Sequence, residues 1–129
     1  MPENVEAKFS IDSWDEQPFD EVPDTSKLTR ASVTKTYSGA VEGTSSTEWL
    51  MSYADDGTAT FVGLERIVGK VGKRKGTIVL QHVGTYADGS ATAHLSVVKG
   101  AGSDDLAGVT GDGEFTADPA GSVSLRLKG

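Results

Sequence analysis

Residues 49–97 read WLMSYADDGTATFVGLERIVGKVGKRKGTIVLQHVGTYADGSATAHLSV, and three short turns divide them into four strand-like runs. Asp55-Asp56-Gly57 is typical of a type I turn followed by a left-handed glycine, which makes a three-residue hairpin loop. Gly72-Lys73 indicates a two-residue type II′ turn, and Asp88-Gly89 indicates a type I′ turn. Three consecutive hairpins predict an antiparallel meander of four strands.

The same pattern continues on both sides of this meander. Short alternating runs broken by glycine recur throughout, and no segment keeps a helical spacing of apolar residues. The fold class is therefore predicted as all-β, a single eight-stranded antiparallel up-and-down barrel with little or no helix, because closure removes exposed sheet edges. The expected strands cover roughly residues 5–13, 28–37, 44–53, 58–68, 75–86, 90–99, 108–116 and 122–128. Pro18 and Pro23 predict an irregular link over 15–26.

The length and the charge distribution predict one domain with an acidic start. A chain of 129 residues fits a single domain, 1–129, in which residues 1–27 form an acidic strand and a covering loop. Residues 1–24 carry eight acids and one lysine, which equals the whole net charge of −7. Such a surface repels phosphate and anionic lipid, so we expect no nucleic-acid and no membrane partner. The basic cluster at 70–75 is interpreted as a solvated hairpin tip rather than an anion site.

Several classes of protein are excluded by what the chain lacks. There is no cysteine, which excludes disulfide scaffolds, thiolate zinc sites and cysteine nucleophiles. No apolar run reaches the roughly 18 residues of a membrane helix, and the first residues do not resemble a secretory signal, so a cytoplasmic protein is expected. The two histidines are predicted on opposite faces of the sheet, so we expect no metal site and no cofactor.

The three turns also set the strand register, and the register decides which side chains share a face. It pairs Met51 with Phe61, Glu65 with Leu80, and His82 with Leu95. The face that we assign to the barrel interior then holds Trp49, Met51, Tyr53, Phe61, Glu65, Ile67, Ile78, Leu80, His82, Leu95 and Val97. The opposite face holds Glu48, Val62, Leu64, Arg66, Val79, Gln81, Val83, His94 and Ser96. A two-residue loop at 55–57 would instead place Glu48 beside Glu65 and Trp49 outside.

Glu65 and His82 are the candidate catalytic residues. They are expected diagonally across neighbouring strands, with Cβ atoms roughly 7–8 Å apart. An enclosed carboxylate must be paired, hydrated or protonated, and a group with a pKa near neutrality can transfer protons in an isomerisation or cyclisation. The candidate ligand-binding residues are Trp49, Met51, Tyr53, Phe61, Ile78, Leu80 and Leu95. The alternative is that Glu65 and His82 form a satisfied polar pair that fills the lumen.

Several segments resemble a family of small bacterial proteins described only as a domain of unknown function. They are the runs at 13–16, 28–35, 63–69, 76–85, 100–103 and 106–108, of which Leu64-Glu65-Arg66 and Leu80-Gln81-His82 are the most specific. That family is grouped with allene oxide cyclase-like barrels. The resemblance implies an eight-stranded antiparallel barrel and implies no established activity or catalytic residues. Ile78 stands where an aromatic is expected in relatives.

Two hypotheses of function follow. The first is a barrel that binds a small apolar or amphipathic molecule in its lumen, with an isomerase or cyclase reaction as its extension. The second is a non-catalytic, self-associating structural or accessory barrel with a filled interior. The apolar residues on the outer face favour a homo-oligomer unless residues 1–26 fold over them. Trp14 is expected to be a packing plug at the mouth of the barrel.

Overall fold

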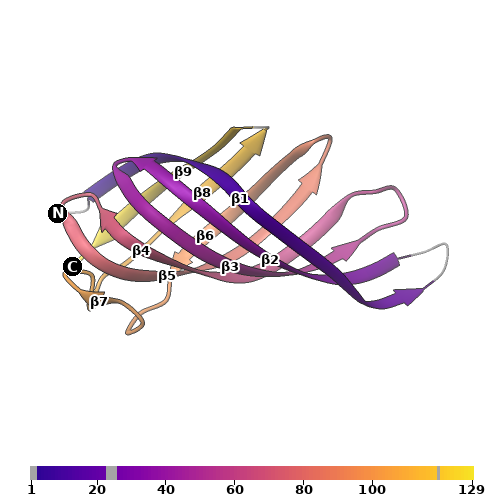
Figure 1. Cartoon of the computed structure of the whole chain (residues 1–129), viewed down its shortest axis with the longest axis horizontal. Helices are drawn as coiled ribbons and strands as arrows, with labels where there is room; N and C mark the ends of the chain where they lie inside the picture. The colour runs from indigo at the N-terminus through magenta and orange to yellow at the C-terminus, as the bar shows by residue number, and fades with distance from the viewer. Residues whose placement is uncertain (1–2, 23–25, 119) are drawn as a thin grey trace.

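The computed structural model describes residues 3–22, 26–118 and 120–129, which form nine antiparallel strands and no helix. Eight strands close into a barrel in the order β4-β3-β2-β1-β9-β8-β6-β5, with β5 pairing back to β4 (Figure 1). The two-residue strand β7 is added to one end of β5. The predicted eight-stranded barrel is therefore confirmed, with one extra strand. The strands are β1 (Glu3–Val22), β2 (Ser26–Gly39), β3 (Val41–Tyr53), β4 (Ala59–Val71), β5 (Arg74–Ala87), β6 (Ser90–Val97), β7 (Ser103–Asp104), β8 (Thr110–Asp118) and β9 (Ala120–Lys128).

All three predicted turns have the expected geometry. Ala54 and Thr58 close the three-residue loop, where Gly57 has a φ of 87°. Gly72 has a φ of 62°, as a type II′ turn requires, and Asp88 and Gly89 both have positive φ, as a type I′ turn requires. The register therefore follows the prediction, with Trp49 opposite Gly63 and His82 opposite Leu95. The alternative register, with Trp49 outside, is wrong.

The predicted irregular link at 15–26 is wrong for the residues that the structure describes. β1 continues to Val22 and stays paired with β2, with register shifts between Ile11 and Ser13 and between Pro18 and Asp20. Beyond Phe9, β1 pairs with β2 alone, so its other edge is free. A proline is tolerated on such an edge because its missing N–H removes no ladder bond. Residues 3–22 consequently form barrel wall and do not cover the outer face; Pro23 lies outside the described residues.

The barrel is closed at the end that carries the two termini and β7 (Figure 1). Leu106 and Val109, from the connection between β7 and β8, are buried with the inward side chains Val41, Val71 and Leu127. The connection between β6 and β7 accounts for Val79, which was expected outside but is only 9% exposed. The chain leaving β6 runs beside it, and the Val98 N–H donates to the Val79 carbonyl oxygen.

Interior aromatic rings are accommodated by glycines on the neighbouring strand. Trp49 lies opposite Gly63, and Phe61 lies opposite Gly84. A Cβ atom added to Gly63 would be 2.5 Å from Cδ1 of Trp49, and one added to Gly84 would be 2.6 Å from Cζ of Phe61. No side chain larger than hydrogen fits there, so these glycines leave the space that the two rings occupy.

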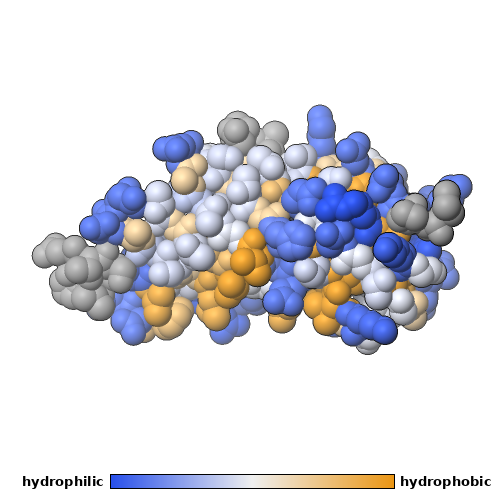
Figure 2. Space-filling model, turned by 180° about the vertical axis from the view of Figure 1, so that it is seen from behind, coloured by the Kyte–Doolittle hydropathy of each residue, from blue (hydrophilic) through white to orange (hydrophobic). Residues whose placement is uncertain are grey.

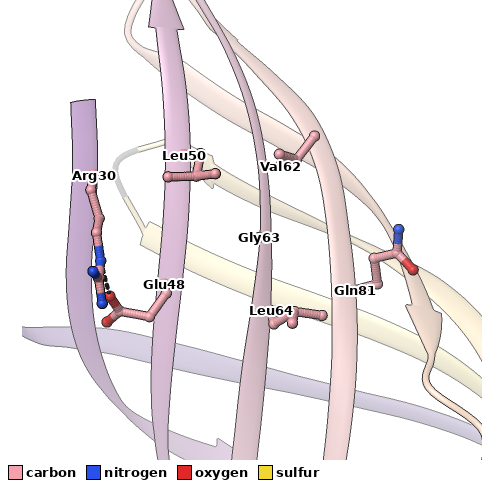
Figure 3. Close-up of a pocket in the computed structure, with 7 residues that line it drawn as sticks. All are labelled: Arg30, Glu48, Leu50, Val62, Gly63, Leu64 and Gln81. Atoms are coloured by element: carbon pink, nitrogen blue, oxygen red, sulfur yellow. Dashed lines mark hydrogen bonds and ion pairs between the residues drawn. The ribbon is translucent and has the colours of Figure 1, made fainter. Parts of the chain in front are cut away.

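The outer face of β3, β4 and β5 is apolar and exposed. Leu64 is 54% exposed, and Leu50, Val62 and Val83 are exposed to a similar extent. A shallow hollow of about 500 Å³ lies on this face, with the ion pair of Arg30 and Glu48 at one side (Figure 3). Figure 2 shows hydrophobic surface between charged side chains on the outside of the barrel.

We predict that this apolar face promotes self-association at high protein concentration, because burying it removes apolar area from water. Sedimentation equilibrium over a range of concentrations measures the association. Leu64→Glu should weaken it at least tenfold, whereas Thr92→Glu, on the outer face of β6, should not. A wild-type protein that stays monomeric at millimolar concentration contradicts this prediction.

Candidate functional site

Five polar side chains meet inside the barrel at the middle of its length. Lys35 and Tyr37 come from β2, Ser45 from β3, Glu65 from β4 and His82 from β5, and all five are buried. Each occupies an inward position of its strand, in line with apolar neighbours. The structure thus brings the predicted pair Glu65 and His82 together and adds three residues that the sequence analysis did not identify.

The Glu65 carboxylate is the centre of this cluster. Its Oε1 lies 2.9 Å from Nε2 of His82, and its Oε2 accepts hydrogen bonds from Tyr37 Oη at 2.5 Å and Ser45 Oγ at 2.6 Å. Nζ of Lys35 lies 3.5 Å away, and both charged side chains are essentially unexposed. Donors from three neighbouring strands therefore converge on one carboxylate, which satisfies its hydrogen-bonding capacity.

The hydrogen bonds define the protonation state of His82. The indole Nε1–H of Trp49 points to Nδ1 of His82 at 3.2 Å. An indole N–H can only donate, so Nδ1 must accept, and the ring proton is on Nε2, where it donates to Glu65. A protonated imidazole would place two N–H groups against each other. His82 is therefore neutral, and Lys35 is the cation that balances Glu65.

The Lys35 ammonium is also surrounded by aromatic rings. It lies 4.5 Å from the ring centroid of Phe9, 5.1 Å from that of Trp49 and 5.2 Å from that of Phe115. These rings come from β1, β3 and β8, on different sides of the barrel. Cation–π contact compensates part of the lost hydration of the ammonium group. Side chains from around the barrel therefore fill the lumen at this level.

Burial and pairing shift the pKa values of the cluster. Burial opposes ionisation of Glu65, but the charge of Lys35 and the hydrogen bonds from His82 and Ser45 outweigh it and lower the pKa to about 2. Burial lowers the pKa of His82 and of Lys35, in each case against the attraction of Glu65. Burial and the Glu65 charge raise the pKa of Tyr37 well above its usual value. At neutral pH the cluster thus contains one ion pair and a neutral imidazole.

A second polar cluster lies at the end of the barrel opposite the two termini, which we call the open end or mouth. Oε2 of Glu16 accepts hydrogen bonds from Thr29 Oγ1 and Tyr53 Oη, both at 2.6 Å, and its Oε1 accepts from Trp14 Nε1 at 3.0 Å. The Trp14 ring centroid lies 5.5 Å from that of Trp49 in a tilted arrangement, so this ring pair connects the two clusters. Trp14 is 44% exposed and packs against Trp49 at the mouth, where a packing role is predicted for it.

The predicted ligand-binding residues divide between the two ends. Trp49, Met51 and Phe61 are buried and Tyr53 is half-buried, all on the side of the mouth. The other three, Ile78, Leu80 and Leu95, are fully buried at or below the level of Glu65. Among residues 3–22, 26–118 and 120–129, no three His, Asp or Glu side chains lie close enough together to hold a metal ion. The same described residues contain no helix that is long and apolar enough to cross a membrane.

The sequence around Lys35 contains a pattern that indicates its inward position. Lys35 alternates with Ala31, Val33 and Tyr37 in a run that is otherwise apolar on one face. A lysine at such a position indicates either a register break or a buried partner. The three predicted turns set the register of β3 to β6 only. They therefore gave no prediction of which β2 residues lie near Glu65.

Comparison with known proteins shows the family of this chain. Residues 5–128 match the family model described as "Protein of unknown function (DUF3224)". The chain belongs to the DUF3224 family. The crystal structure of a DUF3224 protein of unknown function from Shewanella oneidensis MR-1 has a TM-score of 0.79 to this DUF3224 protein, at 27% identity, covering 99% of this chain and 98% of that one. No curated protein matches. The predicted membership of a family of unknown function is thus confirmed, while the allene oxide cyclase-like resemblance stays a prediction.

We predict an unequal response to removing the two buried charges. Glu65→Gln leaves the Lys35 ammonium buried without a counter-charge and should lower the free energy of unfolding by about 3–5 kcal/mol. Lys35→Met should cost less, because Glu65 keeps the hydrogen bonds of His82, Tyr37 and Ser45. Urea unfolding of both variants and of the double variant measures the coupling. Glu48→Gln, on the outer face, is the control, expected within about 1 kcal/mol of wild type. Strictly additive losses would show that the two charges do not interact.

We also predict that acid destabilises the protein in two steps. The unfolded chain protonates His82 near its ordinary pKa while the folded chain does not, so stability falls as the pH drops below about 6.5, by at most about 1.4 kcal/mol per pH unit. Glu65 adds a second loss between its ordinary pKa of 4.5 and about pH 2.

The two histidines provide a matched comparison for the first step. His82→Gln should flatten the dependence of the unfolding free energy on pH between 7 and 5. His94→Gln, at the exposed histidine on the outer face of β6, should leave that slope in place. An unchanged slope in His82→Gln contradicts the assignment of a neutral buried imidazole.

Proposed function

We propose that this DUF3224 protein binds a small amphipathic molecule in the open end of its barrel. The observation that carries the proposal is the half-exposed aromatic lining of the mouth. Tyr53 and Tyr86 occupy inward positions of β3 and β5, and each pairs with Ala59 of β4. Tyr86 is 40% exposed, although its strand neighbours His82 and Gly84 on the same face are buried.

Small side chains on the remaining strands give the mouth its width. Ala91 of β6 lies opposite Tyr86, and Ala117 of β8 lies opposite Ala91. Both alanines are half-buried and pack against the core. Aromatic side chains on one side and alanines on the other are the composition expected of an apolar site with few polar groups. Glu16, Thr29 and the Tyr53 hydroxyl supply those polar groups.

The floor of the proposed site is the layer of stacked aromatic rings. The Phe115 ring centroid lies 6.1 Å from those of Trp49 and Phe61, so rings from β3, β4 and β8 meet across the lumen. In this proposal Trp49, Met51, Tyr53 and Phe61 contact the ligand. Ile78, Leu80 and Leu95 lie behind the floor and support it.

The contacts of Glu65 and His82 favour a positioning role for this pair over a reaction. Glu65 is about six residues along β4 from Ala59 at the mouth, which is roughly 20 Å. Its low pKa makes it a weak base, and Trp49 occupies the free nitrogen of His82. An isomerase or cyclase reaction would need its substrate to pass the aromatic floor. We therefore propose binding as the function and assign the buried pair to holding Trp49 in place.

Titration with octyl glucoside, a neutral amphiphile used below its micellar concentration, tests the proposal. Amide NMR shifts should change at Tyr53, Tyr86, Ala91 and Ala117, and remain unchanged at Leu106 and Val109 in the closed end. The double variant Ala91→Met/Ala117→Met should fill the mouth and lower the affinity at least tenfold.

The control variant is Thr92→Met, which adds similar bulk on the outer face of β6. It should bind as wild type does. Glu65→Gln should also retain binding while its stability changes, because the glutamine oxygen still accepts the His82 N–H that keeps Trp49 in place. Shifts confined to the outer hollow, or normal binding in the double alanine variant, would overturn the proposal.

A further inference from the structure

Charge is unevenly distributed between the two ends of the barrel. The turns at 54–58 and 87–90 lie at the open end together with the second half of β1. The acidic side chains there are Asp15, Glu16, Asp20, Glu21, Asp55, Asp56 and Asp88. Lys27 and Arg30 are the basic side chains described at this end, and Arg30 is paired with Glu48 on the outer face. The closed end carries the basic hairpin 70–75, so the mouth is the negative end of the molecule.

Glu16 is a carboxylate directed inward that forms no direct ion pair with the residues that the structure describes, although the charge of Lys27 acts on it from a greater distance. Its three hydrogen-bond donors, Trp14, Thr29 and Tyr53, are all neutral groups. Among the residues that the structure describes, no lysine or arginine nitrogen lies within 4 Å of its oxygens. Burial opposes its ionisation, but these hydrogen bonds and, to a smaller extent, the charge of Lys27 lower its pKa, so the carboxylate is ionised at neutral pH.

The aromatic side of the mouth already accepts a cation from the chain itself. Nζ of Lys27 lies 4.9 Å from the ring centroid of Tyr53. Lys27 is exposed at its position on β2, so a ligand can displace its side chain into solvent at little cost. The mouth therefore combines a fixed carboxylate with ring faces that a positive group can approach.

We propose that the ligand of the mouth is an organic cation, a protonated or quaternary amine with an apolar tail. The inference rests on the proposed function and names its ligand class. The cationic head lies between Glu16 and the rings of Tyr53 and Trp14, where cation–π attraction and the carboxylate act together. The tail extends toward Ala91 and Ala117. The negative end of the barrel also concentrates cations and speeds their association, an effect that salt screens.

Three probes with the same eight-carbon tail test the ligand class: octyltrimethylammonium, octyl glucoside and octyl sulfate, each below its micellar concentration. Isothermal titration should give the trimethylammonium probe about a tenfold tighter Kd than the glucoside, and the sulfate the weakest binding. Raising the salt from ~20 to ~300 mM should weaken the cation and leave the glucoside unchanged.

Glu16→Gln should remove most of the preference for the cation, which is measured as the ratio of the trimethylammonium affinity to the glucoside affinity in the same variant. The matched control is Glu42→Gln, which makes the same charge change at the exposed far end of β3. Equal affinity for all three probes would overturn the cation inference and leave the proposed function standing. Binding of none of them would overturn the proposed function itself. The probe ranking and salt dependence use wild-type protein, so the test holds even if Glu16→Gln does not fold.

Discussion

The interior of this barrel depends on one buried carboxylate. Glu65 receives hydrogen bonds from Tyr37, Ser45 and His82 and is neutralised by Lys35. Removing a carboxylate from water is costly, and only a full set of donors with a counter-charge compensates for it. The four partners come from β2, β3 and β5, so the requirement fixes the relative positions of these strands around β4. Through His82 it also orients Trp49, and through Trp49 the ring of Trp14 at the mouth.

This arrangement divides the barrel into levels with different chemistry. Aliphatic side chains close the end that carries the termini, the charged cluster fills the middle, and stacked rings separate it from the mouth. In the part of the chain that the structure describes, the mouth combines partial exposure, aromatic side chains and a carboxylate whose hydrogen-bond donors are all neutral. A polar cluster in the lumen is therefore not by itself a site of reaction, since its contacts satisfy one another. We propose that a ligand binds at the mouth instead, where the lining is partly exposed.

The turns made the register predictable. Asp55-Asp56-Gly57, Gly72-Lys73 and Asp88-Gly89 each restrict the backbone to one turn type, and the turn type fixes which residues face each other. This was enough to place Glu65 and His82 inside the barrel among Trp49 and Phe61. It did not extend to Lys35, because the turn between β2 and β3 has no comparable signature. It also failed for β1, where Pro18 suggested a break and the free strand edge tolerated it.

The sequence by itself determined the eight strands of the barrel, the antiparallel order of the central strands and the inward face of each of those central strands, because these follow from local backbone preferences and from a period of two. The contacts between side chains from opposite walls of the barrel were decided only by closure of the sheet. It placed the ammonium of Lys35 between rings of β1, β3 and β8, and it gathered acids from separate turns at one end. Such contacts join residues far apart in the chain. Local preferences do not contain them, since they arise only when the first and last strands pair.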